Sequence, residues 1–235
     1  MYEKETPESI QALFDSIAKS YDRTNAILSF NMHRHWNREL LKLTAHTCSP
    51  AAFLDLCAGT GEIALNYVKQ NNCQAYLLDF SEKMLSCASL KAKRWGIHPQ
   101  KVTFLQADAQ AIPLPDHSME CVTIAYGIRN VQNPQKCFEE VHRVLKPGGI
   151  FGILELTRPD NSLLKVSHQL YLRTLLPLLG KVFSANKEAY SYLSRSIQDF
   201  SQSKELGGNL EKIGFKNISY HPLTGGIATI IKTNK

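Results

Sequence analysis

The stretch LDLCAGTGEIA, residues Leu54–Ala64, joins a short apolar run to a helical pattern through a glycine-rich turn. Its two glycines, Gly59 and Gly61, allow a tight turn from strand to helix and let a ligand approach the backbone closely. Asp79 follows 20 residues after Gly59 and closes the next apolar run. A carboxylate at that place can accept hydrogen bonds from both hydroxyls of a ribose. The stretch therefore predicts a nucleotide-type cofactor site after the first strand of an α/β sheet.

Apolar runs and helical patterns alternate along the rest of the chain. Five runs predict strands, and they cover residues 52–56, 75–79, 102–105, 121–125 and 150–154. Helices are expected over Glu62–Gln70, from the N-cap Ser81 to Arg94, and from Asn133 to a stop at Pro147–Gly149. This alternation favours a mostly parallel sheet covered on both faces. A helix near 203–213 precedes strands at 216–220 and 226–232, and the short connection between these two strands predicts an antiparallel hairpin.

The length and composition are those of a folded globular chain. It has 235 residues, 43% of them hydrophobic, and a formal net charge of +6. We expect a single domain over 1–235, with its Rossmann-like core in 51–159 and 201–235. Residues 1–50 are expected to form a helical lid and residues 160–200 a helical cap insertion, both over the strand edge where open α/β sheets bind ligands.

Several classes of protein are disfavoured by the same composition. No uncharged apolar stretch approaches the ~20 residues that a membrane-spanning helix needs, and the charged start of the chain predicts a cytoplasmic location rather than secretion. The six cysteines include no C-x-x-C pair, so we expect no metal site. The mildly basic pI of about 8.9 allows contact with an acidic membrane surface, but we expect no nucleic-acid partner.

Asp55 helps to choose between two cofactors that fit the glycine turn, because the spacing of Gly59, Gly61 and Ala64 also fits the fingerprint of nicotinamide dinucleotides. A dinucleotide places its diphosphate at the start of the helix, where a carboxylate on the same strand would repel it. S-adenosylmethionine has no phosphate, and its ammonium and sulfonium groups would be attracted to that carboxylate. The pattern favours S-adenosylmethionine over NAD, and a purely structural turn with Asp55 as a cap is the alternative.

A third acid follows the third predicted strand. Asp108 could accept the adenine amino group while the N–H of Ala109 reaches the ring edge, although a helix cap or turn aspartate is an alternative there. Asp55, Asp79 and Asp108 fall at the ends of successive strands. We therefore expect the three acids at one edge of the sheet.

Four segments resemble the C-methyltransferases of ubiquinone and menaquinone biosynthesis. They are Tyr21–Asn25 with Leu28, Ser29, His33 and Trp36, then Gly127–Val131, then Arg143–Gly149 with Glu155, and finally Leu223–Ile227. The resemblance covers nearly the whole chain and implies a class I S-adenosylmethionine-dependent methyltransferase fold. By matching positions it places cofactor roles on Thr60, Asp79, Asp108 and Ala109. The chain departs from the family pattern at Glu62, where Asp is usual, and at Ala125, where a Ser can occur.

The resemblance also implies a reaction. A methyl group would pass from S-adenosylmethionine to a ring carbon of a polyprenylated quinol, in the first place demethylmenaquinol. The alternatives are the benzoquinol step of ubiquinone biosynthesis, another lipophilic small molecule, or a non-catalytic protein that binds S-adenosylmethionine.

Candidate catalytic residues follow from the chemistry of carbon methylation, which needs a phenolate-like ring and a route for one proton. A guanidinium is a poor base but stabilises a developing oxyanion. Arg129 is the expected oxyanion stabiliser and Asn130 would orient substrate or water, the alternative for Arg129 being a pair with a structural carboxylate. Tyr21, Asp22 and His33 are the candidates for base or relay.

The segment 161–187 alternates basic residues with leucines, the bases being Lys165, Arg173, Lys181 and Lys187. That pattern suits a peripheral contact with an anionic membrane, at the inner face of the membrane, and a groove for a polyprenyl tail. A cap helix packed on the core is the alternative. A homodimer is compatible with the sequence, which does not decide the oligomeric state.

Overall fold

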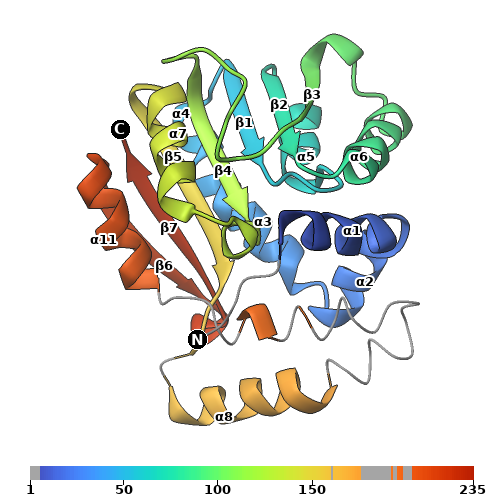
Figure 1. The fold of residues 1–235 in the computed structure, drawn as a ribbon, viewed down its shortest axis with the longest axis vertical. Helices are drawn as coiled ribbons and strands as arrows, with labels where there is room; N and C mark the ends of the chain where they lie inside the picture. The colour runs from blue at the N-terminus through green and yellow to red at the C-terminus, as the bar shows by residue number, and fades with distance from the viewer. Residues whose placement is uncertain (1–5, 160, 176–191, 193–194, 198–202) are drawn as a thin grey trace.

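A seven-stranded sheet forms the centre of the computed structural model, which describes residues 6–159, 161–175, 192, 195–197 and 203–235 (Figure 1). The strand order is β3-β2-β1-β4-β5-β7-β6. Strands β1 to β5 pair in parallel, and β7 runs antiparallel to both β5 and β6. This confirms the predicted α/β class with its C-terminal hairpin. The strands are β1 (Ala52–Leu56), β2 (Gln74–Asp79), β3 (Val102–Gln106), β4 (Met119–Ala125), β5 (Leu145–Leu156), β6 (Lys216–Leu223) and β7 (Ala228–Asn234).

Among the boundaries that differ from the sequence prediction, two involve a proline. Helix α7 (Pro134–Val144) ends before Pro147 rather than at it, and β5 begins directly at Leu145. Residues before a proline disfavour the helical region, which explains the earlier stop. In the hairpin, Pro222 belongs to β6 instead of the turn. A proline is tolerated there because β6 is an edge strand.

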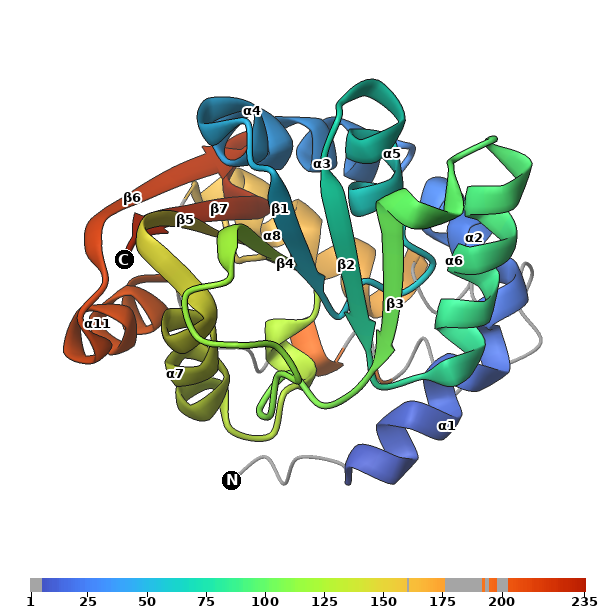
Figure 2. The ribbon, with the colours of Figure 1, turned by 90° about the horizontal axis from the view of Figure 1, so that it is seen from above.

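Helices cover both faces of the sheet (Figure 2). Helices α3 (Met32–Leu43), α5 (Glu62–Gln70) and α6 (Glu82–Arg94) share one buried apolar cluster with β1 and β2. Helices α7 and α11 (Ser203–Ile213) share a second cluster on the other face. The Ser81 hydroxyl accepts a hydrogen bond from the Met84 N–H at 3.1 Å and so caps α6 as predicted.

The N-terminal helices divide between the edge and a face of the sheet. Helices α1 (Pro7–Ile17) and α2 (Tyr21–Leu28) lie over the carboxyl edge of the parallel strands, with α8 (Ser162–Leu170) farther out (Figure 1). The side-chain amide of Gln11 donates to the Phe80 carbonyl at 3.1 Å, which ties α1 to the loop after β2. By contrast, α3 and α4 (Ala45–Cys48) pack against the sheet. The helices over the edge therefore come from 7–28, a smaller part of 1–50 than expected.

Among the described residues, no helix is both long enough and apolar enough to cross a membrane.

Candidate active site

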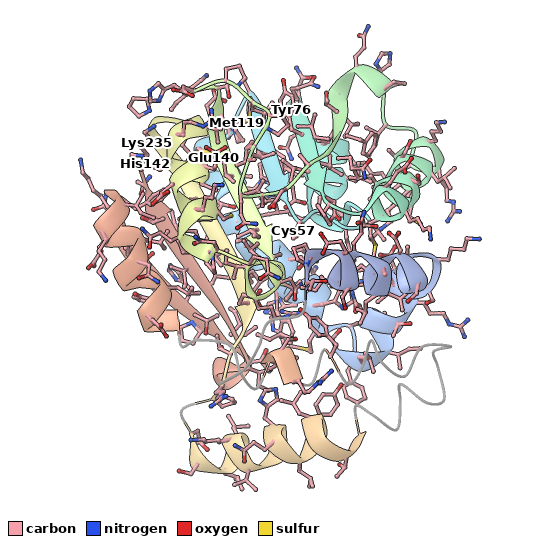
Figure 3. All side chains as sticks on the ribbon, viewed as in Figure 1. Cys57, Tyr76, Met119, Glu140, His142 and Lys235 are labelled. Carbon is pink, nitrogen blue, oxygen red and sulfur yellow. The ribbon has the colours of Figure 1, made fainter. Side chains whose placement is uncertain are left out.

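Two adjoining cavities lie at the carboxyl edge of the sheet. The large cavity has a volume of about 460 Å³ and the small cavity about 120 Å³. Both are bounded by α1, by the loop after β1 and by the loop after β4, and they share residues Phe14, Tyr21, Cys57, Gly59, Ala125 and Tyr126. Cys57, labelled in Figure 3, begins the loop after β1 and contributes to the wall of both cavities. The arrangement offers two neighbouring binding spaces, one compact and one large and mostly apolar.

The glycine turn forms because two positions need backbone angles that suit glycine. Gly59 has a φ of 56° and Gly61 a φ of 75°, both in the left-handed region. A Cβ atom added to Gly61 would lie 2.7 Å from a methyl carbon of Leu77 and 3.1 Å from Cβ of Ala88. Helix α5 can therefore pack this closely against β2 and α6 only when residue 61 is glycine.

The three acids predicted at one sheet edge lie there, since β1, β2 and β3 are neighbours in parallel. Asp55 contributes to the wall of the large cavity, whereas Asp79 and Asp108 contribute to the small one. Asp55 is only 1% exposed and accepts a hydrogen bond from the Thr123 hydroxyl at 2.8 Å. Burial raises the pKa of Asp55 to about 7. A cationic group bound beside it would favour the carboxylate form.

Asp79 is held by backbone groups on both of its oxygens. The N–H of Gly59 donates to Oδ2 at 2.7 Å and the N–H of Ser81 donates to Oδ1 at 2.9 Å. Each carboxylate oxygen has a further lone pair for a ribose hydroxyl. Burial raises the pKa of Asp79. Asp108 accepts the N–H of Gln110 at 2.9 Å, which fixes the turn beside Ala109.

These residues fit S-adenosylmethionine. A ribose acceptor and an adenine-sized space lie together in the small cavity, where Phe80, Asp108 and Ala109 contribute to the wall. Asp55 lies at the neighbouring large cavity, where it can face the cationic end. A diphosphate at the start of α5 would instead be repelled by the carboxylate of Asp55 on the preceding strand.

Thr60 and Asp22 belong to a latch between the lid and the glycine turn. The Thr60 hydroxyl donates to Asp22 Oδ1 at 2.5 Å, and Lys91 Nζ lies 2.6 Å from Asp22 Oδ2. Lys91 also donates to the Thr60 hydroxyl oxygen at 3.1 Å. Both oxygens of Asp22 thus have a partner, Thr60 on the turn and Lys91 on α6. Asp22 is therefore better placed to hold α2 against the turn than to accept a proton.

Arg129 lies at the wall of the large cavity in a buried ion pair. Its Nη1 donates to Glu155 Oε2 at 2.6 Å, and the two side chains are 6% and 3% exposed. Burial lowers the pKa of Arg129, but Glu155, Tyr21 and Tyr192 together raise it above its usual value, so Arg129 stays protonated. Among the described residues, Arg129 Nε is buried without a hydrogen-bond partner. The structure therefore shows the alternative from the sequence, an arginine paired with a carboxylate, and Nε is a further donor atom of this residue that is left without a partner among the described residues.

The remaining catalytic candidates, Asn130, Tyr21 and His33, contribute to the walls of the two cavities. Asn130 contributes to the small cavity, and its Oδ1 accepts the Tyr192 hydroxyl at 2.8 Å. Tyr21 stands between the two cavities, and burial raises its pKa. His33 contributes to the large cavity and is 6% exposed. The structure thus brings Arg129, Tyr21 and His33 to the large cavity.

Three contributors to the site were not identified from the sequence. Tyr126, with a left-handed φ of 56°, donates its hydroxyl to Asn37 Oδ1 at 3.1 Å, and both residues contribute to the wall of the large cavity. Its position directly after β4, at the edge of the sheet where the ligand is expected, could have identified it from the sequence. For Lys91 and Tyr192 the sequence offered none, because their partners are distant along the chain.

Within the part of the chain that the structure describes, no three His, Cys, Asp or Glu side chains come together to hold a metal ion.

The fold and the cofactor edge together define a class I methyltransferase. Solved structures with this fold include the [4+2]-cyclase SpnF, with a TM-score of 0.75 and 14% identity over 100% of this chain and 98% of that one. Another is a SAM-dependent methyltransferase from Aquifex aeolicus, with a TM-score of 0.63 and 19% identity over 94% of this chain and 97% of that one. At these identities the likeness concerns the fold alone.

The sequence comparisons are more specific. The chain belongs to the ubiE/COQ5 methyltransferase family, whose model matches residues 2–235. It is 52% identical over 232 residues to a demethylmenaquinone methyltransferase of Protochlamydia amoebophila (strain UWE25), covering 98% of this chain and 96% of that one. It is 42% identical to a demethylmenaquinone methyltransferase of Chlamydia pneumoniae, covering 93% of this chain and 92% of that one. The family predicted from the sequence is confirmed.

Proposed function

We propose that the protein transfers a methyl group from S-adenosylmethionine to a ring carbon of a polyprenylated naphthoquinol, converting demethylmenaquinol to menaquinol. Both relatives described above are demethylmenaquinone methyltransferases, which favours the naphthoquinol over the benzoquinol ring. The observation that carries the proposal is the position of Arg129. This buried cation lies at the wall of a large apolar cavity that adjoins the cofactor cavity.

The chain's own side chains have four tasks in this reaction. Bound S-adenosylmethionine supplies an electrophilic methyl group. Asp79 and Asp55 bind the cofactor's ribose and its cationic end, while the latch of Asp22, Thr60 and Lys91 holds α2 over the turn. The apolar wall orients the quinol ring and excludes water. Arg129 stabilises the negative charge that develops on the ring oxygen as its hydroxyl group loses the proton, before the ortho carbon attacks the methyl group.

Methyl transfer is tested with radiolabelled S-adenosylmethionine and short-chain demethylmenaquinol, with a demethylated benzoquinol in parallel. We expect label in the naphthoquinol, and a loss of about 100-fold or more in kcat for Arg129→Lys with the affinity for S-adenosylhomocysteine kept, since a lysine cannot reproduce the guanidinium fork. The control variant is Arg38→Lys, on the exposed side of α3. Label in neither quinol would refute the proposed substrate, and an unchanged kcat in Arg129→Lys would refute the role of the arginine.

For the polyprenyl tail we propose a membrane contact through the described part of 161–187; residues 176–191 lie outside the described residues. Helix α8 contributes His168 to the wall of the large cavity. Three apolar side chains of this helix, Leu163, Val166 and Leu170, are 62–79% exposed. Lys165 lies on the same helix and suits an anionic lipid surface. Sedimentation with vesicles containing phosphatidylglycerol should fall several-fold for the double variant Leu163→Glu/Val166→Glu and stay constant for Gln135→Glu on α7. Equal sedimentation of all three proteins would refute the contact.

A further inference from the structure

His33 and Glu62 face each other at the wall of the large cavity. His33, on α3, is 6% exposed, and its Nε2 is buried without a hydrogen-bond partner among the described residues. Glu62 Oε2 lies 3.6 Å from this nitrogen, while Glu62 Oε1 lies 3.7 Å from Nε of Arg34. The side chain of Arg34 is 60% exposed. Glu62 therefore bridges a buried imidazole and the protein surface.

The hydrogen bonds of Ser29 decide which nitrogen of His33 is free to accept a proton. The Ser29 hydroxyl donates its only hydrogen to the Asn25 carbonyl at 2.7 Å. Its oxygen lies 2.6 Å from Nδ1 of His33 and must accept there. Nδ1 thus carries the imidazole hydrogen, and Nε2 keeps its lone pair. This lone pair lies on the nitrogen that is 3.6 Å from Glu62 Oε2.

We propose that His33 Nε2 accepts the hydroxyl proton of the quinol, and that Glu62 positions His33 and passes the proton to the surface. This inference rests on the proposed function, since it assigns the proton acceptor of that reaction. Arg129 stabilises the oxygen's negative charge but stays protonated and cannot take the proton. Tyr126 donates its hydroxyl to Asn37, and both oxygens of Asp22 are engaged.

The proton balance requires such an acceptor. The O–H bond breaks, its electron pair stays on the quinol oxygen, and an N–H bond forms at His33. The ring carbon then forms a bond to the methyl group. The positive charge of the donor's sulfonium and the negative charge of the quinol oxygen are both lost in this step. The hydrogen displaced from that carbon restores the hydroxyl group, so one proton per turnover leaves the site. Glu62 begins α5, and its second oxygen faces exposed Arg34.

The test uses a ligand whose protonation is visible. 2-Methyl-1-naphthol absorbs differently in its neutral and ionised forms, so difference spectra of its complex with protein and S-adenosylhomocysteine report the proton acceptor without turnover. The variants are Glu62→Gln and His33→Asn, with Glu62→Asp as the conservative exchange. Matched controls on α3 are Glu39→Gln, paired with Lys42 at the surface, and His35→Asn, which is exposed.

We expect the ionised fraction of bound naphthol to fall about fivefold or more in Glu62→Gln and His33→Asn, with kcat for demethylmenaquinol reduced about tenfold or more. Glu62→Asp should retain most of both, and the two controls should match the parent protein. The affinity for S-adenosylhomocysteine should stay within twofold in Glu62→Gln. Glu62→Gln is isosteric at a half-buried position, so it keeps the test valid should His33→Asn fold poorly.

Two results would overturn the inference. One is an unchanged ionised fraction and kcat in Glu62→Gln. The other is a loss of S-adenosylhomocysteine affinity with unchanged kcat, which would place Glu62 among the cofactor-binding residues. Failure of the proposed function looks different, because the parent protein itself would then methylate no quinol while the naphthol spectra still report on His33.

Discussion

Replacing Asp55 with asparagine exchanges a buried carboxyl for a neutral group of nearly the same shape. Asp55 is 1% exposed, and burial raises its pKa from 3.8 to about 7. At pH 8 the folded protein must keep this group ionised in surroundings that disfavour charge, whereas the unfolded chain keeps it ionised in water. Asp55→Asn is therefore expected to stabilise the ligand-free protein at pH 8 and to weaken cofactor binding.

The magnitude follows from the pKa values. A rise from 3.8 to about 7 corresponds to about 4 kcal/mol of unfolding free energy at pH 8. About 1 kcal/mol is lost again because the backbone N–H of Ala64 loses its carboxylate acceptor. Since the folded pKa is raised, the parent protein is more stable below pH 3.8 and loses stability as the pH rises through 7. The advantage of Asp55→Asn is thus about 3 kcal/mol at pH 8 and about 0.6 kcal/mol at pH 5.

Thermal unfolding at both pH values measures this difference. For a chain of this size, about 3 kcal/mol corresponds to a rise in Tm of about 6–12 °C at pH 8, with little change at pH 5. Titration calorimetry with S-adenosylhomocysteine should show at least a tenfold loss of affinity, about 1.4 kcal/mol. Glu82→Gln, at an exposed carboxylate of α6, is the control. A rise in Tm that is equal at the two pH values, or an unchanged affinity, would refute the reasoning.

Three further variants test the lid, the ion pair and the turn. Asp22→Asn removes the charge that holds α2 to α6, so calorimetry should show S-adenosylhomocysteine bound about tenfold more weakly with Tm nearly unchanged; tight binding would count against the latch. Arg129→Met leaves Glu155 unpaired and should cost about 3–5 kcal/mol in urea unfolding, most of it recovered in Arg129→Met/Glu155→Leu, which should still lack methyl transfer; no recovery would contradict a charge-based cause. Gly61→Ala should cost more than 2 kcal/mol in urea because its Cβ meets neighbouring side chains, whereas Gly59→Ala, whose Cβ has room, should cost about 1 kcal/mol; equal costs would show that strain alone governs the turn.

The fold was predictable because its signals are local. The turn at Gly59 and Gly61, the cap at Ser81 and the regular alternation of apolar runs each report on neighbouring residues, and together they define a parallel sheet. For the same reason the acids after β1, β2 and β3 could be assigned to one edge. Boundaries were less accurate where a proline permits two outcomes, as at Pro147 and Pro222.

The pairing of side chains across the site was not predictable, because it depends on contacts between distant segments. Asp22 and Lys91 are far apart in sequence, and only the docking of α2 on α6 brings them together. Likewise, the sequence presents His33 as one of several polar residues of the N-terminal signature. Its free nitrogen becomes apparent only when the hydrogen of Ser29 is traced to the Asn25 carbonyl.

The two cavities are formed by different parts of the chain, and this affects the order in which they can form during synthesis on the ribosome. All residues around the small cavity come from 7–132, whereas the large cavity also needs Thr224 and Ile227. The indole N–H of Trp36 on α3 donates to the Thr224 hydroxyl at 2.8 Å, and this bond can form only after residue 224 has been synthesised. All residues that surround the small cavity are therefore synthesised well before the last residues that surround the large one.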